Sequence, residues 1–266
     1  MDADLDLSGE IVVLTGAAGI LGSRYARALT LRGARLALLE RNAEAAASLA
    51  DQINSEHGPV ALAVTTDVGV RASLLAARAR VEAELGAPTV LINNAAAKSA
   101  GFFEPFESFA IEDWDEVMRI NATGVMLGCQ VFGAPMAERG RGSIINILSI
   151  YGIVAPDQRI YEGSSYEGRA INTPAVYSAS KAAVWGLTRY LAAYWGHRGV
   201  RVNAVTPGGV FSGQNDAFVQ RYSARVPLGR MADRDELSGA IVYLASRASS
   251  YVTGHNLVVD GGLSVW

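Results

Sequence analysis

The feature that most constrains this 266-residue sequence is a regular alternation of two kinds of segment. Short apolar runs, rich in β-branched residues, are each followed by a longer Ala-rich amphipathic stretch. This alternation is typical of a parallel sheet with helices on both faces, because each parallel strand needs a crossover to reach the next. We therefore predict an α/β protein, a single domain over 1–266 with a doubly wound, seven-stranded parallel sheet. The expected strands are 11–16, 35–40, 60–68, 89–95, 143–149, 201–208 and 256–262.

Charge and composition exclude several classes of function. The 23 Lys and Arg residues are balanced by 26 Asp and Glu residues and form no basic cluster, so we expect no nucleic-acid partner and no membrane partner. One cysteine, Cys129, and three widely separated histidines exclude a disulfide scaffold and indicate no metal site. The chain has an acidic start and no apolar run of about 18 residues, which together predict a cytoplasmic protein with a small-molecule substrate.

Three glycines follow the first expected strand at a spacing used for nucleotide binding. Gly16, Gly19 and Gly22 stand in TGAAGILG (15–22), where the strand turns into a helix. Glycine permits the tight turn, the close approach of a pyrophosphate and close helix packing, while the helix N-terminus attracts phosphate. The pattern predicts a Rossmann fold whose dinucleotide site includes these glycines and Leu21.

Acidic residues end the next two expected strands. Glu40, 18 residues after Gly22, is placed to accept hydrogen bonds from the adenosine ribose and to repel a 2′-phosphate, which favours NAD over NADP. Arg41 could instead attract that phosphate or stack on adenine, so NADP remains an alternative. Asp67 and Val68 are further candidates for adenine binding, although Asp67 would serve equally as a cap for the following helix.

With these features in place, the chain resembles the short-chain dehydrogenase/reductase family over nearly its whole length. The motifs that carry the resemblance are TGAAGILG (15–22), NNAA (93–96), RINATG (119–124), NILSIYG (146–152), YSASK (177–181), PGGVFS (207–212) and YVTGHNLVVDGG (251–262). Their order along the chain makes the resemblance far more specific than any one motif. The catalytic residues that it implies are Asn121, Ser149, Tyr177 and Lys181.

The resemblance also implies how the cofactor and the subunits are held. Asn93 and Ala95 would line the cofactor ribose, and the segment from Pro207 to Val210 would flank the nicotinamide. The helix over 184–196 would pair across the interface of a homodimer or homotetramer.

The chemistry of the implied catalytic residues agrees with their spacing. A free tyrosine has a pKa near 10 and is a weak base at neutral pH, so a nearby cation must stabilise its phenolate. Tyr177 and Lys181 are four residues apart, on one helix face, where the ammonium reaches both the phenol and the nicotinamide ribose. Tyr177 would take the substrate hydroxyl proton as hydride leaves, and Ser149 would hydrogen-bond the same oxygen. By resemblance to the family, Asn121 would hold a water that links Lys181 to solvent.

These residues predict an NAD-dependent oxidoreductase that interconverts a secondary alcohol and a ketone on a polyhydroxylated or sugar-derived substrate. One alternative is a regulatory or scaffold protein that binds a nucleotide without turnover, which the intact set of Ser149, Tyr177 and Lys181 disfavours. A second alternative is a reductase of lipid or xenobiotic carbonyls.

The chain departs from compact members of the family between Ser149 and Tyr177. The two residues are 28 apart, a longer separation than is usual, and the excess is the polar stretch 153–174. We predict that this stretch forms a polar lid or wall over the site, because long irregular connections are commonly functional. The alternative is that it covers a neighbouring subunit or solvates the rim of the site.

The side chains of this stretch suit a hydroxyl-rich and anionic ligand. Arg159 could bind a carboxylate or phosphate of the substrate, and Tyr161 and Glu162 could bind its hydroxyls, as could Asp157 and Asn172. The stretch also resembles dehydrogenases of flagellin-modification and nonulosonic-acid pathways, which implies a sugar-derived substrate.

Overall fold

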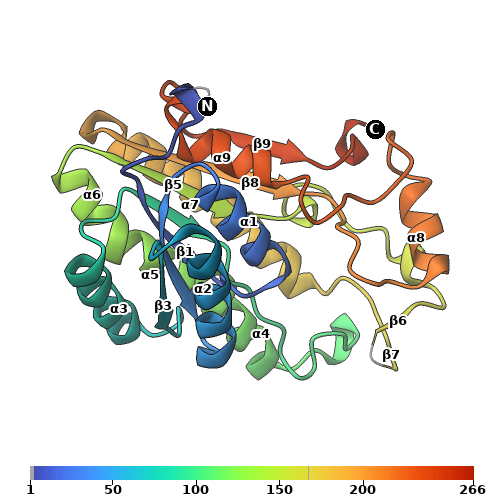
Figure 1. Ribbon diagram of the computed structural model, residues 1–266. Helices are drawn as coiled ribbons and strands as arrows, with labels where there is room; N and C mark the ends of the chain where they lie inside the picture. Colours follow the sequence, from blue (N-terminus) through green and yellow to red (C-terminus); the bar gives the residue numbers. More distant parts are fainter. Residues whose placement is uncertain (1–2, 167) are drawn as a thin grey trace.

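Seven parallel strands make up the central sheet (Figure 1). They are β1 Ile11–Thr15, β2 Arg35–Glu40, β3 Ala61–Thr65, β4 Val90–Asn93, β5 Gly142–Ile147, β8 Val200–Pro207 and β9 Asn256–Val259. The computed structural model describes residues 3–166 and 168–266. The strand order β3-β2-β1-β4-β5-β8-β9 reverses between β1 and β4, which opens a crevice at their carboxyl ends where such sheets bind nucleotides. The predicted doubly wound Rossmann fold is confirmed.

Helices cover both faces of this sheet (Figure 1). They are α1 Ile20–Thr30, α2 Ala43–His57, α3 Arg71–Glu84, α4 Ile111–Met118, α5 Gly124–Gly128, α6 Ala134–Glu138, α7 Ala175–Trp195, α8 Asp216–Ser223 and α9 Ser238–Ala245. Buried side chains of α1, α2 and α9 pack on one face, and those of α3, α5, α6 and α7 pack on the other. In the described part of the chain, no helix combines the length and the apolar character that crossing a bilayer requires.

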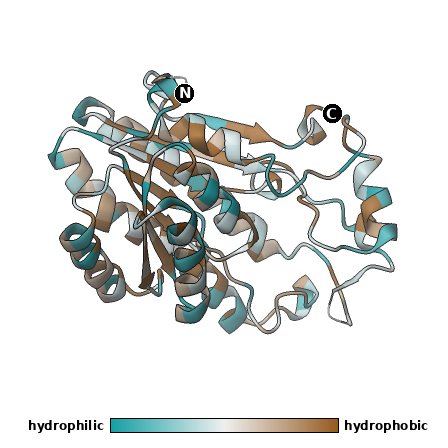
Figure 2. Ribbon diagram, in the orientation of Figure 1, coloured by the Kyte–Doolittle hydropathy of each residue, from teal (hydrophilic) through white to brown (hydrophobic). Residues whose placement is uncertain are grey.

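Because both faces of the sheet are covered, the strands are buried on both sides. Along β1, Val13 belongs to the core beneath α3 and α7, whereas Val12 and Leu14 belong to the core beneath α1, α2 and α9. Figure 2 shows the result as brown central strands inside helices that mix brown and teal. This burial explains why the strands read as continuous apolar runs and not as alternating ones.

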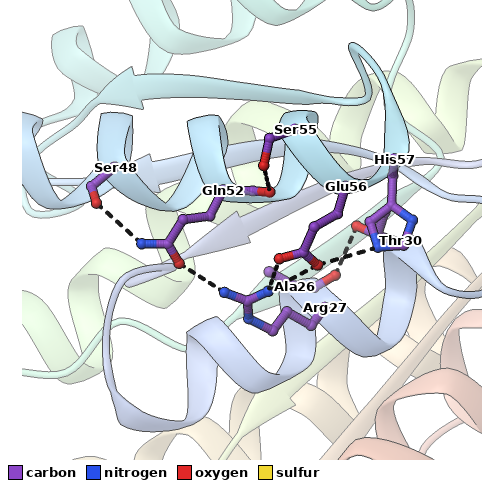
Figure 3. Close-up of polar contacts among 8 residues, drawn as sticks. All are labelled: Ala26, Arg27, Thr30, Ser48, Gln52, Ser55, Glu56 and His57. Carbon is purple, nitrogen blue, oxygen red and sulfur yellow. Dashed lines mark hydrogen bonds and ion pairs between the residues drawn. The ribbon is translucent and has the colours of Figure 1, made fainter.

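Polar contacts between α1 and α2 lie on the outside of the helical layer (Figure 3). Arg27 of α1 donates from Nη2 to Oε1 of Gln52 at 2.7 Å and from Nη1 to the carboxylate of Glu56 at 3.3 Å. Exposed pairs of this kind contribute little to stability. Leu29 of α1 and Ile53 of α2 are instead buried in the same apolar core, which holds both helices against the sheet.

The polar stretch 153–174, called the insertion below, leaves the sheet and lies near α8 at one end of the molecule (Figure 1). It contains a 3₁₀ turn, Gln158–Tyr161, and a short hairpin of β6 Ser165–Tyr166 and β7 Arg169–Ala170. The 3₁₀ turn packs against α8. Glu167, which falls within the predicted lid, lies outside the described residues.

Candidate active site

Between β1 and α1 the chain makes a turn that requires glycine at two positions. Gly16 has a φ of +62°, and a Cβ there would lie 2.8 Å from the Cα of Ala95. A Cβ at Gly22 would lie 2.3 Å from the carbonyl oxygen of Gly16, so the helix packs directly on the turn. Gly19 precedes α1 and provides no side-chain cap, so the first backbone N–H groups of the helix can bind an anion. The turn therefore fits a pyrophosphate.

A cavity of about 760 Å³ opens in front of this turn and runs along the carboxyl ends of the strands. It brings together residues that are far apart in the sequence and that we predicted for cofactor binding. Those that line it are Gly16, Gly19, Leu21, Glu40, Arg41, Asp67, Val68, Ala95 and Val210.

The Glu40 carboxylate lies at the end of β2 and faces the glycine turn. Its Oε1 accepts a hydrogen bond from the backbone N–H of Arg41 at 2.8 Å, and its Oε2 accepts one from that of Ala18 at 3.3 Å. Both bonds hold the carboxylate beside the turn. An adenosine ribose in this cavity would therefore meet a fixed negative charge.

Asp67 does not cap α3, so that alternative is wrong. Its Oδ1 accepts from the backbone N–H of Gly69 at 2.8 Å, and it forms an ion pair with Arg119 at 3.3 Å. The residue before α3 is Val70, whose side chain makes no capping bond. Asp67 and Val68 both line the cavity, so they remain candidates for adenine binding.

The Asn93 side chain faces away from the cavity, which corrects its predicted ribose contact. It is 3% exposed, and its Nδ2 donates to Oδ1 of Asn146 at 2.8 Å, which joins β4 to β5. The next residue, Asn94, lines the cavity instead, and its Nδ2 donates to the carbonyls of Thr15 and Gly16 at 3.0 Å. The two asparagines therefore tie β4 to both of its neighbours.

A second cavity, of about 240 Å³, continues from the first and reaches the predicted catalytic residues. Leu21, Asn94 and Val210 line both cavities, so one extended ligand can occupy the two. The predicted catalytic and nicotinamide-flanking residues that line the second cavity are Ser149, Tyr177, Lys181, Pro207 and Val210.

Tyr177 and Lys181 lie on one face of α7, as their spacing predicts. Lys181 is 4% exposed, and its Nζ lies 5.9 Å from the centroid of the Tyr177 ring and donates to the carbonyl of Ile147 at 2.9 Å. Burial lowers the pKa of Lys181 to about 8 and raises the pKa of Tyr177, because it disfavours the charged form of each. The buried ammonium still carries its charge at neutral pH, and it is the cation that a Tyr177 phenolate requires.

Ser149 follows β5 and begins a 3₁₀ turn that presses against α7. Its Oγ accepts from the backbone N–H of Tyr151 at 3.2 Å. A Cβ at Gly152 would lie 2.8 Å from the Cβ of Lys181, so glycine allows the turn to approach the helix closely. Ser149 and Tyr177 line the same cavity, and the Ser149 hydroxyl opposes the effect of burial on the pKa of Tyr177.

Asn121 lies in a π-helical turn between α4 and α5, a kind of irregularity that often marks functional sites. Its Oδ1 accepts from the backbone N–H of Ala97 at 2.9 Å, and its Nδ2 donates to Oγ of Ser180 at 3.5 Å. Asn121 therefore ties the wall of the cofactor cavity to α7, one residue from Lys181. The water expected at Asn121 stays a prediction.

A third cavity, of about 430 Å³, shares Ser149 and Tyr177 with the second and is the place for a substrate. Its volume lies at the low end of the range for small-molecule sites. Aromatic rings form much of its wall, and several of them carry hydroxyl groups. Those besides Tyr177 are Phe102, Tyr151, Tyr161, Phe218 and Tyr222.

The insertion supplies one wall of this third cavity, but only some of the residues predicted there face it. Tyr161 lines the cavity. Arg159 is 83% exposed and donates from Nε and Nη2 to the Asp157 carboxylate at 2.8 and 2.7 Å. Its guanidinium group is therefore already paired. Glu162 lines an outer groove. Arg159 and Glu162 therefore do not line this cavity, and their substrate contacts stay a prediction that the geometry does not support.

Asp157 holds the insertion against α8. Its carboxylate pairs with Arg159 and with Arg225, which follows α8, and these partners hold the pKa of Asp157 well below its usual range. Arg221 of α8 also donates to the carbonyl oxygen of Glu162. The insertion and α8 are thus tied together beside the third cavity.

We expect Asp157→Ala to raise the KM for the substrate about three- to tenfold and to leave the Kd of the dinucleotide unchanged. The change releases Arg225 from the insertion without touching the cofactor cavity. Steady-state kinetics and a cofactor titration measure the two quantities. Arg159→Ala is the matched control, because it keeps the pair of Asp157 and Arg225, and its KM should stay within about twofold of the parent. An unchanged KM in Asp157→Ala would show that the other contacts of the insertion, among them the bond from Arg221 to Glu162, are enough to hold it.

Comparison with known proteins identifies relatives of the whole chain. Residues 16–264 match the model of a family described as Enoyl-(Acyl carrier protein) reductase. The chain is also 37% identical to D-threitol dehydrogenase of Mycolicibacterium smegmatis, over 100% of this chain and 96% of that protein. The chain belongs to the short-chain dehydrogenase/reductase family.

Two further relatives agree with this membership of the short-chain dehydrogenase/reductase family. Galactitol 2-dehydrogenase (L-tagatose-forming) of Cereibacter sphaeroides is 35% identical, with 98% of this chain and 97% of that protein covered. A crystal structure of a gluconate 5-dehydrogenase from Burkholderia cenocepacia, in complex with NADP and tartrate, matches with a TM-score of 0.88 at 34% identity, covering 99% of this chain and 98% of that one. The chain is thus an NAD(P)-dependent oxidoreductase that interconverts secondary alcohols and ketones. The names of these relatives do not point to flagellin modification or nonulosonic acids.

Sequence reasoning missed two tyrosines of this short-chain dehydrogenase/reductase site. Tyr151 stands two residues after Ser149, and that spacing is the signal that could have found it. Tyr222 accepts a hydrogen bond from the backbone N–H of Gly209, in the turn beside the nicotinamide cavity. No local pattern indicates Tyr222, because α8 reaches the site only through tertiary packing.

Proposed function

We propose that this enzyme interconverts a secondary alcohol and a ketone on a polyol or sugar acid, with NAD as its cofactor. The main support is the hydroxyl-bearing wall of the 430 Å³ cavity beside Ser149 and Tyr177. A substrate with several hydroxyl groups can exchange its bonds to water for bonds to such a wall, whereas a lipid offers the wall almost no hydrogen-bonding groups. Relatives named for threitol, galactitol and gluconate support the same substrate class.

Three side chains would carry the reaction. Ser149 hydrogen-bonds the reacting oxygen and orients it. Tyr177, as the phenolate, accepts the proton of the substrate hydroxyl in oxidation and returns it in reduction. Lys181 stabilises the phenolate through its positive charge. The bound nicotinamide supplies the acceptor or donor of hydride.

A substrate panel followed by NADH absorbance tests this proposal. The panel holds tetritols, hexitols, aldonates, a nonulosonic acid, a hydroxysteroid and a hydrophobic ketone. The highest kcat/KM should fall on a polyol or an aldonate. A preference for the steroid or the hydrophobic ketone would overturn the substrate class, and a preference for the nonulosonic acid would narrow it to the subgroup that the insertion resembles.

We expect NAD to bind about 10- to 100-fold more tightly than NADP, because a 2′-phosphate beside the Glu40 carboxylate brings two like charges together. Titration of each dinucleotide into the free protein, followed by tryptophan fluorescence, measures both affinities. In the matched variant Glu40→Gln the difference should shrink. Equal affinities in the parent would mean that Arg41, which lines the same cavity, compensates for the repulsion, so that NADP serves as well, as in the gluconate 5-dehydrogenase crystal structure.

We propose a homodimer or homotetramer for this enzyme. On α7, the rings of Tyr190 and Tyr194 stack with 5.7 Å between their centroids, yet they are 62% and 54% exposed. Aromatic side chains gathered on an exposed face of a helix are typical of a subunit contact. Light scattering during size-exclusion chromatography measures the assembly.

A further inference from the structure

We propose that the Tyr151 hydroxyl binds a second hydroxyl of the substrate, on the carbon next to the reacting one. The inference rests on the proposed function and makes it more specific, since the group recognised becomes a vicinal diol or the matching α-hydroxy ketone. Tyr151 lines the 430 Å³ cavity, and its backbone N–H binds the Oγ of Ser149 at 3.2 Å, so it extends directly from the residue that orients the reacting oxygen.

Tyr151 stands at the end of a chain of three hydroxyls. Oγ1 of Thr173 lies 2.5 Å from the Tyr161 hydroxyl, and the Tyr161 hydroxyl donates to that of Tyr151 at 3.2 Å. Each hydroxyl has only one proton to donate. Because Tyr161 gives its proton to Tyr151, Thr173 must donate to Tyr161, and the last proton of the chain belongs to Tyr151.

That last proton is available to a ligand. Within residues 3–166 and 168–266, the Tyr151 hydroxyl accepts from Tyr161 and donates to no acceptor. Burial raises the pKa of Tyr151, so its phenol stays protonated and remains a donor at every working pH. An oxygen of the substrate is the partner that this donor lacks.

Gln214, another polar residue of the cavity, is already engaged. Its Oε1 accepts from the backbone N–H of Ser212 at 2.7 Å, and its Nε2 donates to the carbonyl of Val210 at 3.2 Å. Gln214 therefore holds the segment after β8.

Tyr151→Phe tests the proposal with two alcohols that differ by one hydroxyl, butane-2,3-diol and butan-2-ol. The kcat/KM for the diol should fall about 10- to 100-fold, because the second hydroxyl loses its donor. The kcat/KM for butan-2-ol should stay within about twofold, because that alcohol never uses the donor. The Kd of NAD should not change. Tyr251→Phe, the same chemical change on a fully exposed ring, should affect neither alcohol.

Equal losses on both alcohols would overturn the proposal, since Tyr151 would then only position the turn after Ser149. The absence of any loss would overturn it as well. Thr173→Val gives a second measurement: it breaks the hydroxyl chain at its far end and keeps Tyr151, so it should cause a smaller loss on the diol, about two- to fivefold, and none on butan-2-ol. Failure of the proposed function would look different from failure of this proposal, because the parent enzyme would then oxidise no polyol of the substrate panel.

Discussion

Tyr177→Phe is expected to lower kcat by about 10³- to 10⁴-fold, because it removes the one hydroxyl that transfers the substrate proton. The ring itself should stay in place, since it packs edge-on against Phe102 with 6.2 Å between centroids. The Kd of NAD should therefore remain within about threefold of the parent value. Steady-state oxidation of the best polyol and a fluorescence titration with NAD measure the two quantities.

A matched control for this variant is a tyrosine outside both the site and the proposed subunit contact. Tyr251→Phe makes the same chemical change at a fully exposed ring, and it should keep the activity of the parent. If Tyr177→Phe retained more than about a tenth of the parent kcat, a loss smaller than general acid–base catalysis normally provides, Tyr177 would not be the proton-transfer group.

Lys181→Ala should damage both turnover and cofactor binding. The buried ammonium lies beside the Tyr177 ring and within the cavity that continues from the glycine turn, so it can serve the phenolate and the nicotinamide ribose together. We expect kcat to fall about 10²- to 10³-fold and the Kd of NAD to rise about tenfold. The same kinetic and binding assays apply, and an unchanged Kd would disprove the dual role.

The pH dependence of the activity that remains in Lys181 variants distinguishes the effect of the Lys181 charge from the effect of its side-chain volume. Oxidation needs the Tyr177 phenolate, so its rate rises as pH rises through the pKa of Tyr177. Burial raises that pKa. In the parent, we expect the Lys181 ammonium beside the ring to favour the phenolate. In Lys181→Met, which keeps the length of the side chain, the pKa should rise further, and the pH optimum for oxidation should move to higher pH. The optimum of Lys181→Arg should move less.

Local spacing was enough to predict the residues that act along one element or at one turn. Gly16, Gly19 and Gly22 were predictable because a single βα turn sets their positions, and the structure requires glycine at the first and last of them. Tyr177 and Lys181 were predictable because the period of a helix places residues four apart on one face. Each of these predictions depends on geometry within about one turn of chain.

Predictions that required side-chain direction were less successful. Asn93 and Asn94 are neighbours at a strand end, where successive side chains point to opposite sides, and the one chosen for the cofactor faces Asn146. Arg159 has the right chemistry for an anionic substrate, but a carboxylate two residues away takes its guanidinium. Neither outcome can be read from residue type.

By itself, the sequence determined the seven-stranded doubly wound sheet, the dinucleotide turn and the pairing of Tyr177 with Lys181. The continuous apolar runs of the strands, the helical period of 3.6 and the steric demands of glycine each act over a few residues, so the order of amino acids encodes them directly. The tertiary structure alone decided which side chains surround the substrate. Tyr151, Tyr161 and Tyr222 come from a turn, the insertion and α8, and they line one cavity only because packing of these separate segments brings their rings together. Such contacts depend on the directions of side chains across the whole fold, and no local period encodes them.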